Sequence, residues 1–137
     1  MFLTICRIRH IIILNYKRKM TKYDIEFYSK ENGEEPAREF ILELDEKMQA
    51  KMLKIIDLLE VNGPQMRLPY SESLEDGIFE IRAKQSSNIT RVLYFFAVGR
   101  KIILTNGFVK KTRKTPKREI KLAKKYRADY ERRLCDE

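Results

Sequence analysis

The chain of 137 residues has few of the side chains that build metal centres, disulfide frameworks and histidine-based active sites. It contains two cysteines, one histidine and no tryptophan. Cys6 and Cys135 lie near opposite ends and form no CxxC motif, so the sequence indicates neither a disulfide framework nor a zinc site. His10 is the single histidine, which excludes catalysis by a pair of histidines. We therefore expect no metal or other cofactor, and a reducing, cytoplasmic setting.

Long apolar runs are also missing. No run approaches the roughly 20 residues of a membrane-spanning helix. The apolar residues 11–14 have basic residues on both sides, unlike the apolar region of a signal peptide. We expect no membrane partner and no secretion. Residues 1–19 are interpreted as a leader outside the domain, with an extra edge strand at residues 8–14 as the alternative, and residues 20–137 have the length of one domain.

Basic residues are in excess and unevenly placed. The formal net charge is +9, which favours contact with a polyanion. Residues 23–62 carry a net charge of −6, whereas residues 110–133 carry +9. A cationic run at residues 110–114 directly follows Phe108 and the most strand-forming stretch of the chain. Cations held at the end of a strand are suited to binding a phosphate backbone.

The apolar pattern predicts an N-terminal strand followed by two helices. Large and charged side chains alternate over residues 23–28, the period of a half-buried strand. Pro36 is placed for the first turn of a helix, behind acidic residues that suit the helix N-terminus. Asp45 is a second N-cap, and apolar residues recur at helical spacing until Gly63-Pro64 ends the helix. We expect the two helices to form a hairpin packed on a sheet.

Further β-rich runs and a last helix follow. A short stretch ends at Leu74, and three runs cover residues 78–84, 89–97 and 101–109. The breaks at residues 86–87 and 99–100 are typical of tight hairpin turns, and Thr115-Pro116 caps a helix. The predicted fold class is α+β, with an N-terminal strand, a two-helix hairpin packed on an antiparallel sheet of three to four further strands, and a C-terminal helix.

Two-residue turns would fix the register of the three runs. They place Arg82 opposite Arg91 and Arg91 opposite Phe108, so two arginines and an aromatic ring share one row. The other rows on that face are Lys84 with Ile89 and Lys110, Glu80 with Leu93 and Asn106, and Ile78 with Phe95 and Leu104. The face thus changes from apolar to cationic along the strands. Like charges opposite each other destabilise a sheet, so the arginine row suggests a bound anion.

These segments carry a resemblance to a known family. The motifs are residues 76–82, 91–96 and 107–112, and Thr115-Pro116 with Glu119-Ile120 and Ala123. Together, from about residue 23 to residue 130, they resemble the phage Gp49-like, HigB-type branch of the RelE/ParE toxin superfamily. The resemblance implies the toxin of a type II toxin-antitoxin pair, a ribosome-dependent endoribonuclease that cuts messenger RNA and inhibits translation. It also implies a cognate antitoxin, often of the helix-turn-helix type, that silences the toxin in a hetero-oligomer.

The resemblance also implies roles for individual residues. The strand arginine that contacts the scissile phosphate in RelE-like nucleases corresponds to Arg91. Arg82 corresponds to a basic strand position beside it, and Lys110 and Lys111 to further basic residues at the end of the last strand. The tyrosine that some members have after this basic pair has no counterpart here, since Lys117 lies near its place. The identity of the proton-transfer group is therefore open.

Metal-independent RNA cleavage needs the 2′-hydroxyl aligned on the adjacent phosphate, cations for the growing charge, and a group that moves protons. Arg82, Arg91 and Lys110 can supply the cations. Glu80 or Lys111 can move protons. The candidate RNA-binding residues flank this group, and one of them can stack a base: Lys84, Phe108, Arg113, Lys114 and Lys117.

Other interpretations remain open. Arg82 and Arg91 can pair with Glu80 or other carboxylates, Phe108 can belong to the core, and residues 110–125 can be a solvated helix face. At the level of function, ParE-like relatives inhibit DNA gyrase without cleaving nucleic acid. A basic face is also expected in a non-catalytic nucleic-acid-binding protein.

Overall fold

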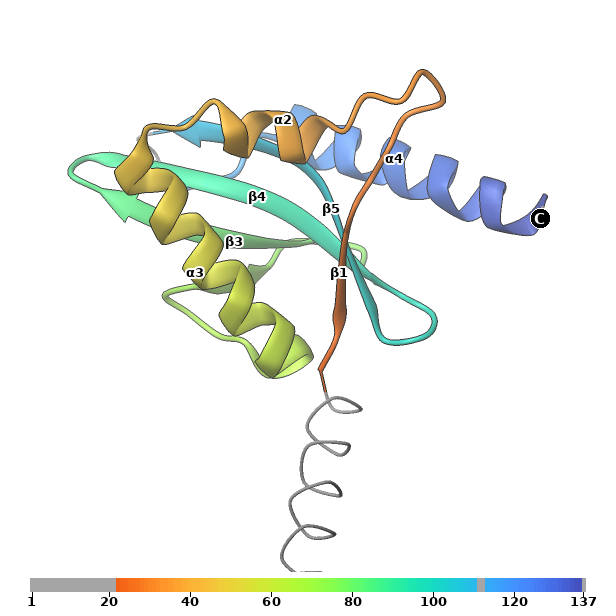
Figure 1. Cartoon of the computed structure of the whole chain (residues 1–137), viewed down its shortest axis with the longest axis horizontal. Helices are drawn as coiled ribbons and strands as arrows, with labels where there is room; N and C mark the ends of the chain where they lie inside the picture. Colours follow the sequence, from red (N-terminus) through yellow and green to blue (C-terminus); the bar gives the residue numbers. More distant parts are fainter. Residues whose placement is uncertain (1–21, 111–112, 137) are drawn as a thin grey trace, which may run out of the picture.

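The computed structural model describes residues 22–110 and 113–136 and has an α+β fold (Figure 1). The elements in chain order are β1 (Asp24–Phe27), α2 (Pro36–Leu42), α3 (Glu46–Asn62), a 3-10 turn (Gly63–Gln65), β2 (Ser71–Ser73), β3 (Phe79–Gln85), β4 (Asn88–Ala97), β5 (Lys101–Lys110) and α4 (Lys117–Cys135). The strands form one sheet in the order β1-β5-β4-β3-β2. The expected leader, residues 1–19, lies outside the described residues.

The sheet is mixed. β2, β3, β4 and β5 pair antiparallel, as expected for the four later strands, but β1 pairs in parallel with β5 at one edge. The predicted antiparallel arrangement of the later strands is therefore confirmed, and the parallel N-terminal strand, whose direction the sequence did not predict, makes the sheet mixed. The physical reason is that β1 lies beside the last strand of the chain and not beside the next one. No short turn sets its direction, and a parallel neighbour is reached through long connections.

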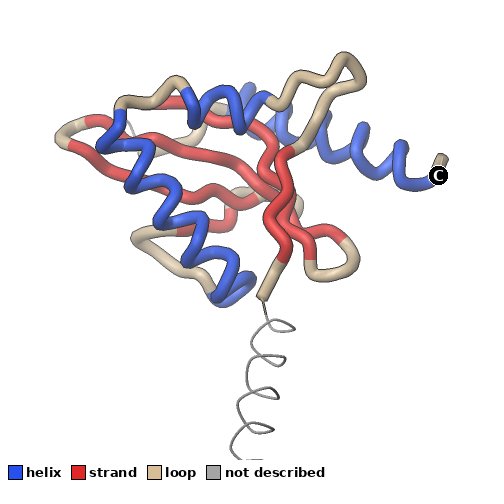
Figure 2. The backbone as a smooth tube through the Cα atoms, in the orientation of Figure 1, coloured by secondary structure: helices blue, strands red, loops and turns tan. Residues whose placement is uncertain are grey.

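α2 and α3 do not form the expected helical hairpin. α2 packs on β5 and α3 packs on β3, and each helix contacts the sheet more than it contacts the other helix (Figure 1). This face of the sheet is too wide for one helix to cover, so the two helices lie on different strands. In the tube view α2 and α3 lie in front of the red strands, whereas α4 begins behind α2 and extends from there to the C-terminus (Figure 2).

Local capping signals explain where the two helices begin and end. Pro36 occupies the first turn of α2, and the Asp45 side chain accepts a hydrogen bond from the backbone N–H of Met48 at 2.8 Å. Gly63 ends α3 with a φ of 53°, and a Cβ at this position would lie 2.4 Å from the Tyr23 ring. These three expectations are confirmed. Glycine is required at the end of α3 by both backbone conformation and space.

The core lies on both faces of the sheet, because neighbouring residues of a strand point to opposite sides. Val92 and Leu93 of β4 are both fully buried, one under α3 and one under α4. The expected apolar faces of the helices are buried: Met48, Met52, Ile55, Ile56 and Leu59 of α3, and Ile120, Ala123 and Tyr126 of α4. Among the helices of the described residues, none has the length and apolar character that crossing a bilayer requires.

The β4–β5 hairpin contains a loop and a bulge that compensate each other. Ala97 pairs with Lys101, so the loop spans residues 98–100 and is one residue longer than expected. A β-bulge then follows between Leu93 and Tyr94, and Thr105 is the extra residue on β5. The Thr105 hydroxyl donates to the Leu93 carbonyl at 3.2 Å. The bulge removes the one-residue offset that the longer loop introduces.

The compensation decides which predicted rows are correct. On the side of the bulge away from the turn, Arg91 lies opposite Phe108 as expected. On the side next to the turn, Phe95 pairs with Ile103 and not with Leu104. Ile78 precedes β3 and joins no strand pair. The predicted apolar row of Ile78, Phe95 and Leu104 is therefore wrong, and the cationic rows are confirmed.

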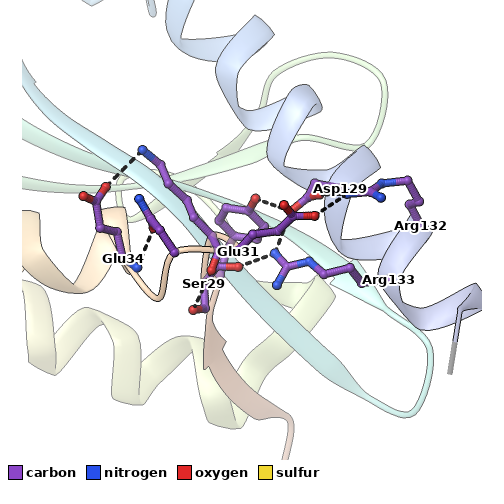
Figure 3. Close-up of polar contacts among 9 residues, drawn as sticks. Ser29, Glu31, Glu34, Asp129, Arg132 and Arg133 are labelled. Carbon is purple, nitrogen blue, oxygen red and sulfur yellow. Dashed lines mark hydrogen bonds and ion pairs between the residues drawn. The ribbon is translucent and has the colours of Figure 1, made fainter.

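A polar cluster fastens the C-terminal end of α4 to the segment after β1 (Figure 3). Asp129 accepts from the Tyr28 hydroxyl at 2.5 Å and from Arg132 and Arg133 at 2.6 Å each. Arg133 also donates to the Ser29 carbonyl, and its guanidinium lies 5.4 Å from the centre of the Tyr28 ring. The cluster ties the C-terminal part of α4 to Tyr28 and Ser29, which directly follow β1.

This cluster predicts loss of stability at both ends of the pH scale. Hydrogen bonds, first that from Tyr28, lower the pKa of Asp129 from 3.8 to about 2, while burial and then the bond to Asp129 raise the pKa of Tyr28 from 10.0 to about 12. The free energy of unfolding should fall as the pH drops from 3.8 towards 2 and as it rises from 10 towards 12. Denaturant titrations across these windows measure it, with Tyr28→Phe and the exposed Tyr70→Phe as a pair. An equal alkaline slope in Tyr28→Phe and wild type would contradict the assignment.

Gly107 of β5 predicts a second effect on stability. A Cβ at this position would lie 2.3 Å from Cδ1 of Phe40 in α2, so Gly107→Ala forces ring and strand apart. Overpacking of this kind costs about 1–3 kcal/mol. Urea unfolding should show that loss, and a smaller loss when Gly107→Ala is made in a Phe40→Leu background, since the smaller side chain leaves room. Equal losses in both backgrounds would exclude the clash as the cause.

Candidate functional site

The sequence-predicted residues gather where β3, β4 and β5 pair beyond the bulge. Arg82 of β3 lies opposite Arg91 of β4, which lies opposite Phe108 of β5. The adjoining row contains Lys84 and Lys110, paired through Ile89 between them. These side chains lie on the α4 face, where Leu93 and Phe95 of the same strand contact that helix. The start of α4 and the segment before it therefore border the cationic end of the sheet.

A buried hydrogen-bond chain links the two arginines. Both oxygens of the fully buried Glu80 carboxylate accept: Oε1 from Nε of Arg82 at 2.6 Å and Oε2 from the hydroxyl of Thr115 at 2.5 Å. The Thr115 oxygen accepts in turn from Nη1 of Arg91 at 3.0 Å. Thr115 thus connects β4 with β3 through charge-assisted hydrogen bonds, which are stronger than neutral ones.

Arg91 is a buried residue in this conformation. Its exposed fraction is 0%, and its guanidinium lies 5.8 Å from the centre of the Phe108 ring. Burial lowers the pKa of Arg91 from its ordinary value, and the Glu80 charge opposes that effect. Burying an ion costs several kcal/mol unless partners compensate it, and here Glu80, Thr115 and Phe108 supply compensation. Arg91 holds the site together from inside and does not reach solvent.

Arg82 lies at the boundary between this network and solvent. Its side chain is 16% exposed, and its Nη2 contacts Oε2 of Glu72 at 2.5 Å and donates to the Arg113 carbonyl at 3.1 Å. Pairing of Arg82 with Glu80, which the sequence left open as an alternative, is observed. Arg82 is therefore oriented by two carboxylates, with its outer nitrogen directed to the surface.

A hollow of about 520 Å³ opens next to Arg82. Its lining includes Arg82 of β3, Arg113 and Lys114 from the segment before α4, and the carboxylates Glu72 and Glu75. The main chain of this segment is fixed to Arg82 by the Arg113 carbonyl bond. The hollow therefore combines three cations with two acids beside the buried network.

Of the remaining predicted residues that the structure describes, Arg113 and Lys114 line this hollow, whereas Lys84, Lys110 and Lys117 are not among its lining residues. Lys84 is exposed near the end of β3, and Lys110 is half-buried at the end of β5. Arg113, Lys114 and Lys117 are exposed on the segment that enters α4. Lys111 lies outside the described residues. The structure thus brings together Glu80, Arg82, Arg91 and Phe108, with Arg113 and Lys114 at the opening.

Thr115 and Glu72 were missed as site residues from the sequence. Thr115 was expected to cap α4, but the N-cap position is Pro116 and no side chain caps the helix there. The Thr115 hydroxyl is instead used by Glu80. The signal that could have identified it is a buried carboxylate at Glu80 beside two arginines, which requires a further donor. Within residues 22–110 and 113–136, no group of three or more His, Cys, Asp or Glu side chains is arranged to hold a metal ion.

The hydroxyl of Thr115 predicts a measurable contribution to stability. Thr115→Val keeps the shape and removes the hydroxyl, so Glu80 loses a donor in a buried place. Leaving a buried polar group short of a partner costs about 1–3 kcal/mol, and more where the group is charged. Urea unfolding should show this loss for Thr115→Val, and a much smaller loss for Thr115→Ser, which keeps the hydroxyl. Equal destabilisation by both changes would mean that the methyl group, not the hydroxyl, matters here.

Comparison with known proteins gives one family. The model of the family described as phage derived protein Gp49-like matches residues 39–128, roughly two thirds of the chain. The match includes β2 to β5 and the complete Glu80–Thr115–Arg91 network. No curated protein matches the chain. The chain therefore belongs to the phage-derived Gp49-like family, which is part of the RelE/HigB-type toxin group.

Proposed function

We propose that this protein is the toxin of a type II toxin-antitoxin system and that it cleaves messenger RNA on the ribosome. The family supports a toxin-like protein. The observation that carries the nuclease proposal is the convergence of Arg82, Arg113 and Lys114 on one hollow beside the buried Glu80 network. Cations held by a sheet and by a short connection are positioned before substrate arrives, which favours stabilisation of a charged transition state.

In this proposal Arg82 contacts the scissile phosphate. Its Nε stays on Glu80, while Nη2 exchanges the partly exposed carboxylate of Glu72, at 39% side-chain exposure, for a phosphate oxygen. An arginine has five donors in a fixed plane, so it can keep one carboxylate and bind an anion at the same time. The 2′-hydroxyl of the preceding ribose then loses its proton and attacks the phosphorus atom, the bond from phosphorus to the 5′ oxygen of the next nucleotide breaks, and that oxygen takes up a proton, which leaves a 2′,3′-cyclic phosphate. Arg82 with Lys114 and Arg113 stabilises the negative charge that builds on the phosphate oxygens.

Arg91 and Glu80 act as positioning residues in the conformation described. Both are fully buried, and Thr115 links them. Direct contact between Arg91 and the phosphate, which the family resemblance implies, requires the Thr115 segment to leave its place. We propose Lys110 and Lys84 as further phosphate contacts and Lys117 as a contact to the RNA strand as it enters the site. Lys111 is the candidate for proton transfer. The ribosome supplies most of the alignment of the 2′-hydroxyl in this proposal.

The proposed partners follow from the same assignment. They are a cognate antitoxin, of the helix-turn-helix type in this proposal, that binds the toxin in a hetero-oligomer, and messenger RNA with the ribosome in the cytoplasm. Because the proposed site is strongly basic, an antitoxin with acidic side chains would complement it.

A second function is supported by a specific observation. Arg91 is buried and Arg82 is paired with two carboxylates, which is an arrangement expected of a structural network. A ParE-like toxin that inhibits DNA gyrase by binding, or a non-catalytic nucleic-acid-binding protein, needs no arginine free for chemistry. The two classes differ in what happens to messenger RNA and to DNA in the cell.

Arg82→Ala is the variant that tests the nuclease. Induction of the wild-type chain in a bacterium should arrest growth and produce new messenger RNA 5′ ends at codon spacing. Loss of one donor to a transition state costs about 10²–10³-fold in rate, so Arg82→Ala should abolish these ends, whereas Arg38→Ala, on an exposed arginine of α2, should not. Thermal unfolding of Arg82→Ala and Arg82→Lys separates loss of chemistry from loss of fold. DNA damage with intact messages would instead identify a gyrase inhibitor.

A further inference from the structure

A groove that adjoins the hollow runs along the outer edge of β3. β2 covers the edge of β3 only over Phe79–Ile81, and one more backbone hydrogen bond follows, from Arg82 N–H to the Tyr70 carbonyl at 2.8 Å. Among the described residues, no strand pairs with this edge of β3 beyond Arg82, where the cationic rows begin. Beyond this point α3 approaches the strand. Nζ of Lys51 donates to the Lys84 carbonyl at 3.0 Å. The groove is the space between α3, the residues before β2 and this edge.

The charged residues that line the groove are all basic. Its volume is about 580 Å³, within the range of roughly 300–1,000 Å³ typical of small-ligand sites. Its charged lining comes from three separate elements and consists of Lys51, Lys54, Arg82, Lys84 and Arg113. Two of these, Lys51 and Lys54, come from α3 and were not predicted as site residues from the sequence. Lysines from different elements converging on one groove form an anion-binding surface.

The rest of the lining is apolar and partly open to solvent. Leu58 is 37% exposed, Leu68 is 62% exposed and Tyr70 is 46% exposed. Ile55 and Ala83 close the floor and are buried. A flat aromatic and aliphatic surface bordered by ammonium groups matches an unpaired nucleotide, whose base has an apolar face and whose phosphates are anionic.

The neighbouring hollow indicates on which side of Arg82 an RNA strand would run. The two depressions share Leu68, Arg82 and Arg113, so they meet at the arginine that we place on the scissile phosphate. The hollow has Glu72 and Glu75 in its lining, whereas the groove has no acid among its described lining residues. The hollow balances its three cations with two acids, so a phosphate backbone that reaches Arg82 is attracted more strongly on the α3 side.

We propose that the groove between α3 and β3 binds single-stranded RNA next to the cleavage position, with a base on Tyr70 and Leu68 and phosphates on Lys51, Lys54 and Lys84. This inference rests on the proposed function, because it takes Arg82 as the contact for the scissile phosphate. An acidic peptide would also be attracted by the lysines. RNA fits better because one continuous strand satisfies both depressions through the shared Arg82 and uses the aromatic ring of Tyr70.

Binding of a short RNA to the full-length protein tests the groove without the ribosome. The probe is a fluorescein-labelled single-stranded oligonucleotide with 2′-O-methyl riboses, which cannot be cleaved through the 2′-hydroxyl, followed by fluorescence anisotropy at several salt concentrations. Lys54→Gln should weaken binding and reduce the salt slope by about 0.7, the value for one phosphate contact on a single strand. Lys47→Gln, an exposed lysine on the same helix outside the groove lining, should leave both unchanged.

Tyr70 separates base stacking from simple charge attraction. Removing a stacking ring costs about 1–3 kcal/mol per base, so Tyr70→Ala should weaken binding roughly 5- to 150-fold at an unchanged salt slope, and Tyr70→Phe should bind like wild type. A length-matched RNA duplex should be insensitive to Tyr70→Ala, because its bases are not available for stacking. Equal binding by Tyr70→Ala and wild type, or equal effects of Lys54→Gln and Lys47→Gln, would overturn the groove. The groove would also be reassigned, to an acidic peptide, if polyglutamate displaced the RNA and Tyr70→Ala lowered the affinity for polyglutamate as much as the affinity for RNA.

The outcomes are separable from those for the proposed function. If the variants lower RNA affinity as expected and the wild-type chain produces no new 5′ ends in cells, the nuclease fails and the RNA groove stands. If new 5′ ends appear at codon spacing while the groove variants bind and cleave like wild type, the nuclease stands and the groove is wrong.

Discussion

One buried threonine joins the sheet of this protein to its C-terminal helix. Thr115 donates to Glu80 of β3 and accepts from Arg91 of β4, and the next residue but one begins α4. Because both partners are charged and fully buried, the segment before α4 has few alternative positions. That fixes the Arg113 carbonyl on Arg82, and so fixes where exposed cations stand relative to the sheet. The surface chemistry of the candidate site depends on this internal contact.

The second constraint is the bulge at Thr105. Without it, the longer loop at residues 98–100 would shift β5 by one residue and turn Phe108 away from Arg91. With it, the strand has one register near the turn, which serves the apolar core, and another near the cationic end, which serves the site. Gly107 lies on the opposite face just beyond the bulge and lets Phe40 of α2 approach closely.

Much of this fold follows from short-range patterns. Pro36, Asp45 and Gly63 set helix ends through interactions with near neighbours, and the two-residue turn at residues 86–87 fixes β3 against β4. What could not be predicted depends on distant residues. β1 takes its direction from β5. The sequence predicted neither the three-residue loop nor the bulge, and the pairing of Arg91 with Phe108 was predicted correctly because the two offsets cancel. Burial of Arg91 depends on Thr115, 24 residues away, and on the ring of Phe108 from the next strand. A row of opposed arginines in a sequence does not reveal whether an external anion or an internal Glu80 neutralises it.

Charge along the sequence is also a poor guide to charge in space. Residues 23–62 are acidic overall, yet Lys51 and Lys54 of that segment lie in a groove whose charged lining residues are all basic. Lys51 and Lys54 lie three residues apart on α3 and so share a face, and the approach of α3 to the β3 edge brings Lys51 to the Lys84 carbonyl. Glu72 and Glu75 lie on the other side of Arg82. An anionic chain therefore meets a gradient centred on Arg82, to which the packing of α3 on β3 contributes Lys51 and Lys54 in addition to Arg113 from the basic C-terminal segment.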